Sequence, residues 1–88
     1  MKTWDKDPDA VLDYSIDWSA WLTTDTIINS TWIVPTGIIK DSDNHDTTSS
    51  TIWLSGGTKG QEYILTNRIE TAGSRTEDRS IKIIIKDR

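Results

Sequence analysis

The chain has 88 residues, of which 34% are hydrophobic and five are tryptophan, and a net charge of −4, as expected for one small domain with a thin core. The absence of cysteine excludes disulfides, thiolate metal sites and cysteine nucleophiles. The negative charge argues against general nucleic-acid binding, and no apolar run approaches the ~18 residues that a membrane-spanning helix needs.

Residues 1–11 form a polar segment in which Trp4 is the only aromatic side chain and Asp7-Pro8 marks a turn. This composition predicts an N-terminal arm over residues 1–11, either flexible or used for docking, ahead of a single domain over residues 12–88. The start of the chain is charged and no apolar run follows it, unlike a secretory signal peptide. We therefore expect that the protein is not secreted by a signal peptide.

Residues 12–18 alternate between apolar and polar side chains, which predicts a strand with one buried face and one acidic face. Residues 27–34 are largely β-branched or aromatic and end at Pro35, which cannot donate to a ladder, so they predict a second strand. Both faces of this second strand are partly apolar. One face carries Ile28, Trp32 and Val34, and the other carries Ile27 and Ile33.

Further short strands are predicted along the rest of the chain. Residues 38–39 indicate one strand, followed by a soft acidic loop over residues 41–50, and the other strands cover residues 51–54, 61–71 and 80–86. The last two strands form a hairpin around Gly73 and Ser74. A register that keeps the buried faces together places Leu65 opposite Ile83 inside, and Ile64 opposite Ile84 outside.

About six to eight short strands without a helical segment predict an all-β fold, namely an immunoglobulin-like or fibronectin-like antiparallel β-sandwich. The glycine-rich segment 54–60, shortly before Tyr63, resembles the corner of such sandwiches at which a tyrosine hydroxyl bonds to the upstream backbone. We expect the Tyr63 hydroxyl to bond within or near this corner.

No group of residues predicts catalysis or a bound metal. The segment Asp41–Asp46, with the pattern D-x-D-x-x-D, lacks the glycine and the bidentate glutamate of an EF-hand loop and is interpreted as a solvated acidic loop. His45, the single histidine, has no partner at a fixed geometry. Asp13 and Asp17 would lie about 13 Å apart on one strand face, beyond the ~5–9.5 Å of paired glycosidase carboxylates. We expect no enzymatic activity, metal or cofactor.

The same alternation separates core residues from residues that are available to partners. The predicted core side chains are Tyr14, Trp18, Trp32, Tyr63, Leu65 and Ile83. The candidate protein-contact residues, on outward faces or on the arm, are Trp4, Ile33, Trp53, Ile64 and Ile84. Grouped apolar residues on the surface of a small protein indicate an interface. Two alternatives are that the arm with Trp4 folds over one of these patches, and that Trp53 with Trp21 or Trp4 stacks on a sugar.

Four segments, taken in this order, resemble a family of short phage and prophage proteins labelled fibre–tail adaptors. They are residues 13–18 (DYSIDW), 30–35 (STWIVP), 53–58 (WLSGGT) and 63–69 (Y-x-LTN-x-I). The resemblance runs from about Lys6 to Lys86 and implies an immunoglobulin-like virion protein without catalytic residues. It also implies synthesis in the bacterial host cytoplasm and protein–protein contacts in multiple symmetric copies, with tail, fibre or capsid proteins as partners. Together with the charge and hydropathy above, we expect neither nucleic acid nor a membrane as a partner. The alternatives are a capsid decoration protein and a carbohydrate-binding module that helps attachment to host surface glycans.

Overall fold

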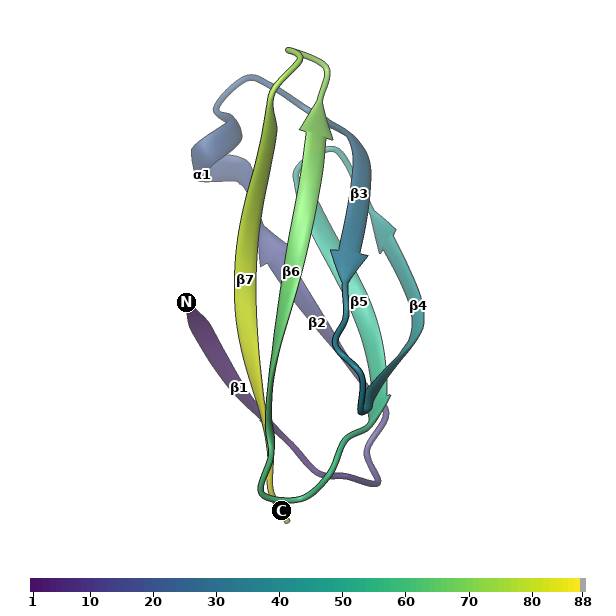
Figure 1. Ribbon diagram of the computed structural model, residues 1–88. Helices are drawn as coiled ribbons and strands as arrows, with labels where there is room; N and C mark the ends of the chain where they lie inside the picture. The colour runs from purple at the N-terminus through teal and green to yellow at the C-terminus, as the bar shows by residue number, and fades with distance from the viewer. Residues whose placement is uncertain (88) are drawn as a thin grey trace.

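The computed structural model describes residues 1–87, which form two β-sheets packed face to face (Figure 1). The four-stranded sheet has the order β1-β7-β6-β3, and the three-stranded sheet has the order β2-β5-β4. Neighbouring strands are antiparallel except β1 and β7, which are parallel. The predicted all-β sandwich is confirmed. The elements of the described chain are β1 (Lys2–Lys6), β2 (Leu12–Asp17), α1 (Ser19–Leu22), β3 (Ile27–Ile33), β4 (Ile38–His45), β5 (Ser49–Gly56), β6 (Glu62–Thr71) and β7 (Thr76–Ile85).

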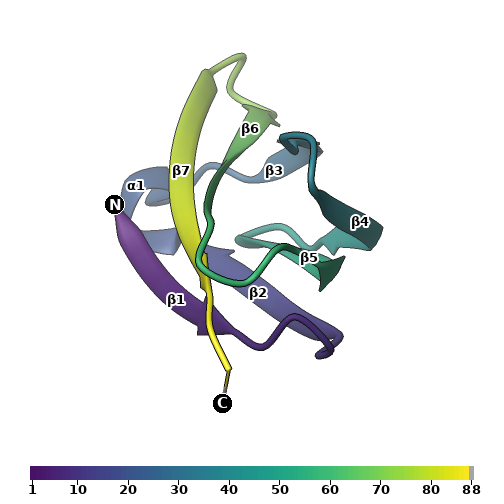
Figure 2. The ribbon, with the colours of Figure 1, turned by 60° about the horizontal axis from the view of Figure 1, so that its bottom comes forward.

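The core lies between the two sheets, which face each other across it in Figure 2. Burial alternates along β6 and along β7 from Ser80 to Ile85, because every second residue of these segments points inward, whereas the first four residues of β7 are all exposed. All six residues that we expected in the core are buried there, namely Tyr14, Trp18, Trp32, Tyr63, Leu65 and Ile83. Removing these large apolar side chains from water is the main favourable contribution to folding.

A buried hydrogen-bond network connects the two sheets through the core. Asn67 has no exposed surface; its Oδ1 accepts a bond from Trp18 Nε1 at 3.0 Å, and its Nδ2 donates to Ser30 Oγ at 2.9 Å. Ser30 Oγ lies 2.6 Å from Ser50 Oγ, which also accepts a bond from Trp32 Nε1 at 3.1 Å. Within residues 1–87, no buried side-chain nitrogen or oxygen lacks a partner. The network therefore fixes the orientation of both core tryptophans.

The N-terminal segment differs from the expected arm, because residues 2–6 form an edge strand of the sandwich. β1 runs parallel to β7, from Lys2 opposite Ile81 to Lys6 opposite Ile85. The Trp4 side chain is half-buried, and its ring centroid lies 5.0 Å from that of Tyr14. The isoleucine-rich edge of β7 is thus covered from within the chain. The sandwich begins at residue 2, and the boundary expected before residue 12 is not present.

Lys6 is the most unexpected core residue, because its side chain has no exposed surface. Its ammonium group donates to the carbonyl oxygens of Asp7 at 2.9 Å and Gly56 at 2.8 Å. Burial lowers the pKa of Lys6, and the nearby carboxylates Asp7, Asp41 and Asp9 oppose this effect. These bonds tie the end of β1 to the end of β5.

Two further segments differ from the expected elements. The acidic stretch expected as a loop over residues 41–50 continues as strand β4 to His45 and turns into β5 at Ser49. Asp46 makes this turn tight, because its Oδ1 accepts bonds from the N–H groups of Thr48 at 2.8 Å and Ser49 at 2.7 Å. The chain also has a helix, the four-residue α1, where none was expected.

The register of the β6–β7 hairpin differs from the expected one. Leu65 lies opposite Ile81, and Ile84 lies opposite Glu62. The reason is a tight turn in which the Thr71 N–H donates to the Arg75 carbonyl at 2.9 Å and Ser74 adopts the left-handed conformation, with a φ of 65°. Because of this turn, each residue of β6 lies opposite a residue of β7 that is two positions earlier in the chain than we expected.

The ambiguous faces of β3 are explained by a β-bulge. The register shifts between Ile27 and Asn29, so that Ile27 and Trp32 are both buried although their numbers differ in parity. Ile28, which was grouped with Trp32 in the sequence, is 61% exposed. Strict alternation fails at this one position because a bulge adds a residue to one strand.

The expected tyrosine corner is present, since the Thr58 N–H donates to the Tyr63 hydroxyl oxygen at 3.0 Å. We predict that Tyr63→Phe lowers the free energy of unfolding by about 1 kcal/mol, because this N–H loses its acceptor in a partly buried place. Chemical denaturation measures the change. An unchanged midpoint would show that the corner contributes nothing to stability.

Asn67→Leu tests the network between the sheets. Leucine removes the acceptor of the Trp18 indole N–H and the donor to Ser30, so we predict a loss of about 2 kcal/mol or more. Ile64→Thr, at an exposed position of the same strand, serves as the control and should change stability by no more than about 0.5 kcal/mol. Equal stabilities of the two variants in urea denaturation would contradict the role given to the network.

Candidate functional site

The acidic segment Asp41–Asp46 that the sequence singled out lies along the end of β4 and in the turn that follows it. No group of three or more His, Asp or Glu side chains among residues 1–87 is placed to hold a metal ion. Asp46 accepts bonds from the turn that it caps, and His45 Nδ1 lies 3.0 Å from the Asp46 carbonyl oxygen. Over the same residues, no helix has the length and apolar character to cross a membrane. The surfaces of the two sheets are therefore the features to consider.

The outer face of the four-stranded sheet carries a diagonal row of isoleucines from β3, β6 and β7. Ile64 is the middle residue of the row. Ile33 of β3 lies opposite Thr66, which is two residues from Ile64 on the same face of β6. Ile84 of β7 lies opposite Glu62, which is two residues from Ile64 in the other direction. Such diagonal neighbours lie ~7–8 Å apart, within reach of long side chains. Three of the expected contact residues are thus brought together. We call Ile33, Ile64 and Ile84 the isoleucine stripe.

Exposure varies along the isoleucine stripe. Ile33 is 49% exposed and Ile64 is 47% exposed, whereas Ile84 is half-buried. Ile84 lies beside Asp5 of β1 as well as Glu62, so the N-terminal strand covers part of the side chain that we expected to be free. The accessible centre of the stripe is therefore Ile64 with Ile33.

Ion pairs surround the isoleucine stripe on the same face. They are Lys82–Glu62 at 3.5 Å, Lys86–Asp5 at 3.4 Å and Arg68–Asp78, in which Nε lies 2.8 Å from Oδ1. The bonds from Arg68 lower the pKa of Asp78, and the same bonds raise the pKa of Arg68. An apolar centre within a charged rim is the usual arrangement of a protein–protein interface.

The outer face of the three-stranded sheet carries a second apolar pair. Trp53 is 39% exposed and lies between Asp13 of β2 and Ser42 of β4. Ile39, which is 57% exposed, lies opposite Ser55, two residues from Trp53. We call Trp53 and Ile39 the tryptophan patch. Ile39 was missed in the sequence, although one of two consecutive isoleucines in a strand must face outward.

The remaining tryptophans do not share a surface with Trp53. Trp4 packs against Tyr14 on the inner side of β1, and Trp21 packs edge-on against Trp18, with ring centroids 5.6 Å apart. The platform of two exposed, coplanar aromatic rings that sugar binding requires is therefore not formed by Trp53 with either of them.

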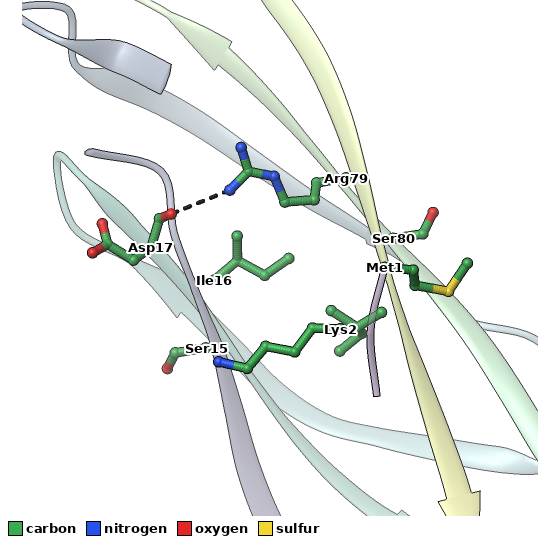
Figure 3. Close-up of a pocket in the computed structure, with 8 residues that line it drawn as sticks. Met1, Lys2, Ser15, Ile16, Asp17, Arg79 and Ser80 are labelled. Atoms are coloured by element: carbon green, nitrogen blue, oxygen red, sulfur yellow. Dashed lines mark hydrogen bonds between the residues drawn. The ribbon is translucent and has the colours of Figure 1, made fainter. Parts of the chain in front are cut away.

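A groove opens where β2 and the start of β1 leave the two sheets unjoined (Figure 3). It has a volume of about 410 Å³ and is lined by Met1, Lys2, Ser15, Ile16, Asp17, Arg79, Ser80 and Ile81. The Arg79 guanidinium donates to the Asp17 carbonyl at 3.2 Å and lies 4.2 Å from the Trp18 ring centroid. The sequence did not identify Arg79, because its contacts with Asp17 and Trp18 join segments that lie about 60 residues apart in the chain.

The fold places the chain among immunoglobulin-like β-sandwiches. It is similar to the solution structure of the PKD domain from the KIAA 1837 protein, with a TM-score of 0.59 and 19% sequence identity. The similarity covers 98% of this chain and 79% of that chain, and at this identity it shows the fold alone. No curated protein matches the sequence.

Residues 6–84 match the family described as podophage GP4 fiber-tail adaptor protein gp77, and the chain belongs to this family. The match extends from the end of β1 to within β7, so it covers both outer faces of the sandwich. It confirms the family that the four sequence segments indicated.

Asp25, which follows α1, is hydrogen-bonded to the turn between β6 and β7. Its Oδ1 accepts a bond from the Gly73 N–H at 2.9 Å, and its Oδ2 accepts a bond from Arg75 Nε at 3.0 Å. The Arg75 guanidinium also lies over the Trp21 ring, 4.1 Å from its centroid. The Thr71 hydroxyl, followed by the neighbouring N–H groups, holds the pKa of Asp25 well below its usual range.

We predict that acid weakens the stabilising contribution of these Asp25 hydrogen bonds. Because the pKa of Asp25 is lowered in the folded state from an ordinary value of 3.8, its contribution to stability is present above that value and is lost as the pH falls through the folded pKa. Asp25→Asn should therefore lower Tm near pH 7 and reduce the fall in Tm on acidification, as measured by calorimetry. A variant with the wild-type Tm near neutral pH and the wild-type acid profile would contradict this role.

Proposed function

We propose that this protein is a non-enzymatic structural component of a podophage virion that joins tail and fibre proteins by direct contact. Membership of the fibre–tail adaptor family supports this function. The observation that carries it is the isoleucine stripe, an exposed apolar row inside a rim of ion pairs on a very small protein.

The two-sided arrangement of apolar residues supports a joining role. The isoleucine stripe lies on the outer face of one sheet and the tryptophan patch on the outer face of the other, so they point in opposite directions. Because two packed sheets are ~10 Å apart, the two apolar surfaces are separated by the thickness of the sandwich. One copy would therefore hold two partners on opposite sides, and several symmetric copies would repeat the contact around the tail.

Binding through both faces also agrees with the small size of the domain. Each outer face offers only a few apolar side chains among hydroxyl and charged residues, and a few anchor residues carry most of the energy of an interface. Ile64 and Trp53 are the central residues of the two faces. On the same face of the strand, Ile64 is flanked by Glu62 and Thr66, and Trp53 is flanked by Thr51 and Ser55, which are all polar. They are the residues to change.

We predict that Ile64→Lys and Trp53→Ser each reduce incorporation into particles by about tenfold or more, because each removes a central anchor. Incorporation is measured by quantitative mass spectrometry of purified virions, and folding is checked from Tm. Ile28→Lys is the matched control, since Ile28 is 61% exposed but lies outside both patches. Full incorporation of both test variants would exclude the two faces as contacts.

A further inference from the structure

The groove of Figure 3 lies beside an open strand edge of β2. Within residues 1–87, β2 pairs only with β5, and the N–H of Trp18 donates to the Thr48 carbonyl at 2.9 Å. In an antiparallel ladder the hydrogen-bonded residues alternate, so the even-numbered residues of β2 bond to β5. The N–H and C=O groups of Ser15 and Asp17 consequently point away from β5, toward the groove.

Arg79 confirms this direction and limits the length of the open edge. Its guanidinium donates to the Asp17 carbonyl at 3.2 Å, which requires that carbonyl to face the groove. One acceptor is thereby used, and both backbone groups of Ser15 remain at the edge. Ser15 is therefore the residue at which an additional strand would pair.

The side chains around this edge favour a particular kind of segment. Ile16 and Ile81 are buried and supply the apolar floor of the groove. The side chains of Lys2 and Arg79 extend toward β2 (Figure 3). The Asp17 carboxylate points away from the groove in the same view and accepts a bond from the Ser19 N–H at 2.9 Å. The groove thus combines an apolar floor with two cationic side chains.

We propose that this groove binds an extended segment of a virion partner, which pairs with β2 at Ser15 and places an apolar side chain over Ile16 and Ile81 and an acidic side chain between Lys2 and Arg79. The site deepens the proposed function, because it gives the adaptor a main-chain contact in addition to its two faces. Strand addition supplies affinity through backbone hydrogen bonds and specificity through alternate side chains.

The occupant is a different protein rather than a second copy of this chain. The seven strands of residues 1–87 are already paired within their own sheets. The acidic turn residues Asp25 and Asp46 are held by bonds to their own turns. A second copy presents its open strand edges, including the acidic β4, only as part of a packed sheet. The groove, with a volume of about 410 Å³ between β2 and the residues Lys2 and Arg79, has room for a single extended segment and not for a sheet.

Ser15→Pro and Ser15→Ala form a matched pair of test variants. Both remove the hydrogen bond between Ser15 Oγ and Thr51 Oγ1, at 2.7 Å, but only proline removes the N–H at the open edge. Because this N–H points away from β5, proline at this position leaves the β2–β5 ladder intact. We expect Ser15→Ala to enter particles at the wild-type level and Ser15→Pro to fall at least tenfold.

Equal incorporation of the two variants would overturn the proposal. If Ser15→Pro does not fold, hydrogen exchange of the wild-type protein decides instead. The amides of residues 12–18 should be slower to exchange in isolated tails than in the free protein, and equal exchange would overturn the proposal. A concentration-dependent dimer that Ser15→Pro abolishes would assign the groove to a second copy and overturn the choice of occupant.

Lys2→Glu tests the acidic side chain of the partner, with Lys59→Glu as the control, because Lys59 is exposed and lies outside the groove. We expect incorporation to fall for Lys2→Glu alone, and an equal response of both would overturn the proposed charge preference.

The proposal about the groove can be wrong while the proposed function is right, and the experiments separate the two cases. Normal entry of Ser15→Pro with loss of Ile64→Lys leaves the adaptor role standing, whereas absence of the wild-type protein from virions removes both.

Discussion

The hydrogen bond from Trp18 Nε1 to Asn67 Oδ1 is the constraint on which the arrangement of the two sheets depends. It links the residue that follows β2 to the middle of β6, and Ser30 and Ser50 extend it between β3 and β5. Sliding one sheet over the other would leave these groups unpaired in the core, at a cost of about 1–3 kcal/mol for each. The network therefore sets the relative position of the outer faces and, through Arg79 over Trp18, one wall of the groove.

Much of this fold is predictable from alternation alone. The inward sets of β2, β6 and β7 follow from period-two patterns, as does the outward direction of Ile64 and Trp53. The pattern is less informative where local geometry intervenes. The bulge after Ile27 moves Ile28 to the surface, and the turn at Ser74 shifts the pairing of Ile84. No propensity predicts β1, since its buried residue Lys6 is charged and is satisfied only by carbonyls that the fold brings to it.

The position of β1 explains why the surface is less apolar than the sequence indicates. A free β7 would expose an isoleucine-rich edge, a template for unwanted pairing, and the short parallel strand covers it with Trp4 and the stem of Lys6. Lys2 is the first residue of β1, and the groove with the open edge of β2 lies at this end of the covering strand. The chain thus covers the isoleucine-rich edge of β7, which could otherwise pair with other chains, and leaves the shorter edge of β2 accessible beside two charged side chains.

Electron cryo-microscopy of the intact podophage tail tests the central claim most directly, because it shows which chains surround the adaptor in place. We predict that one virion protein covers the isoleucine stripe and that a different chain covers the tryptophan patch on the opposite face. A reconstruction in which both outer faces are exposed to solvent would contradict a joining role that uses these surfaces.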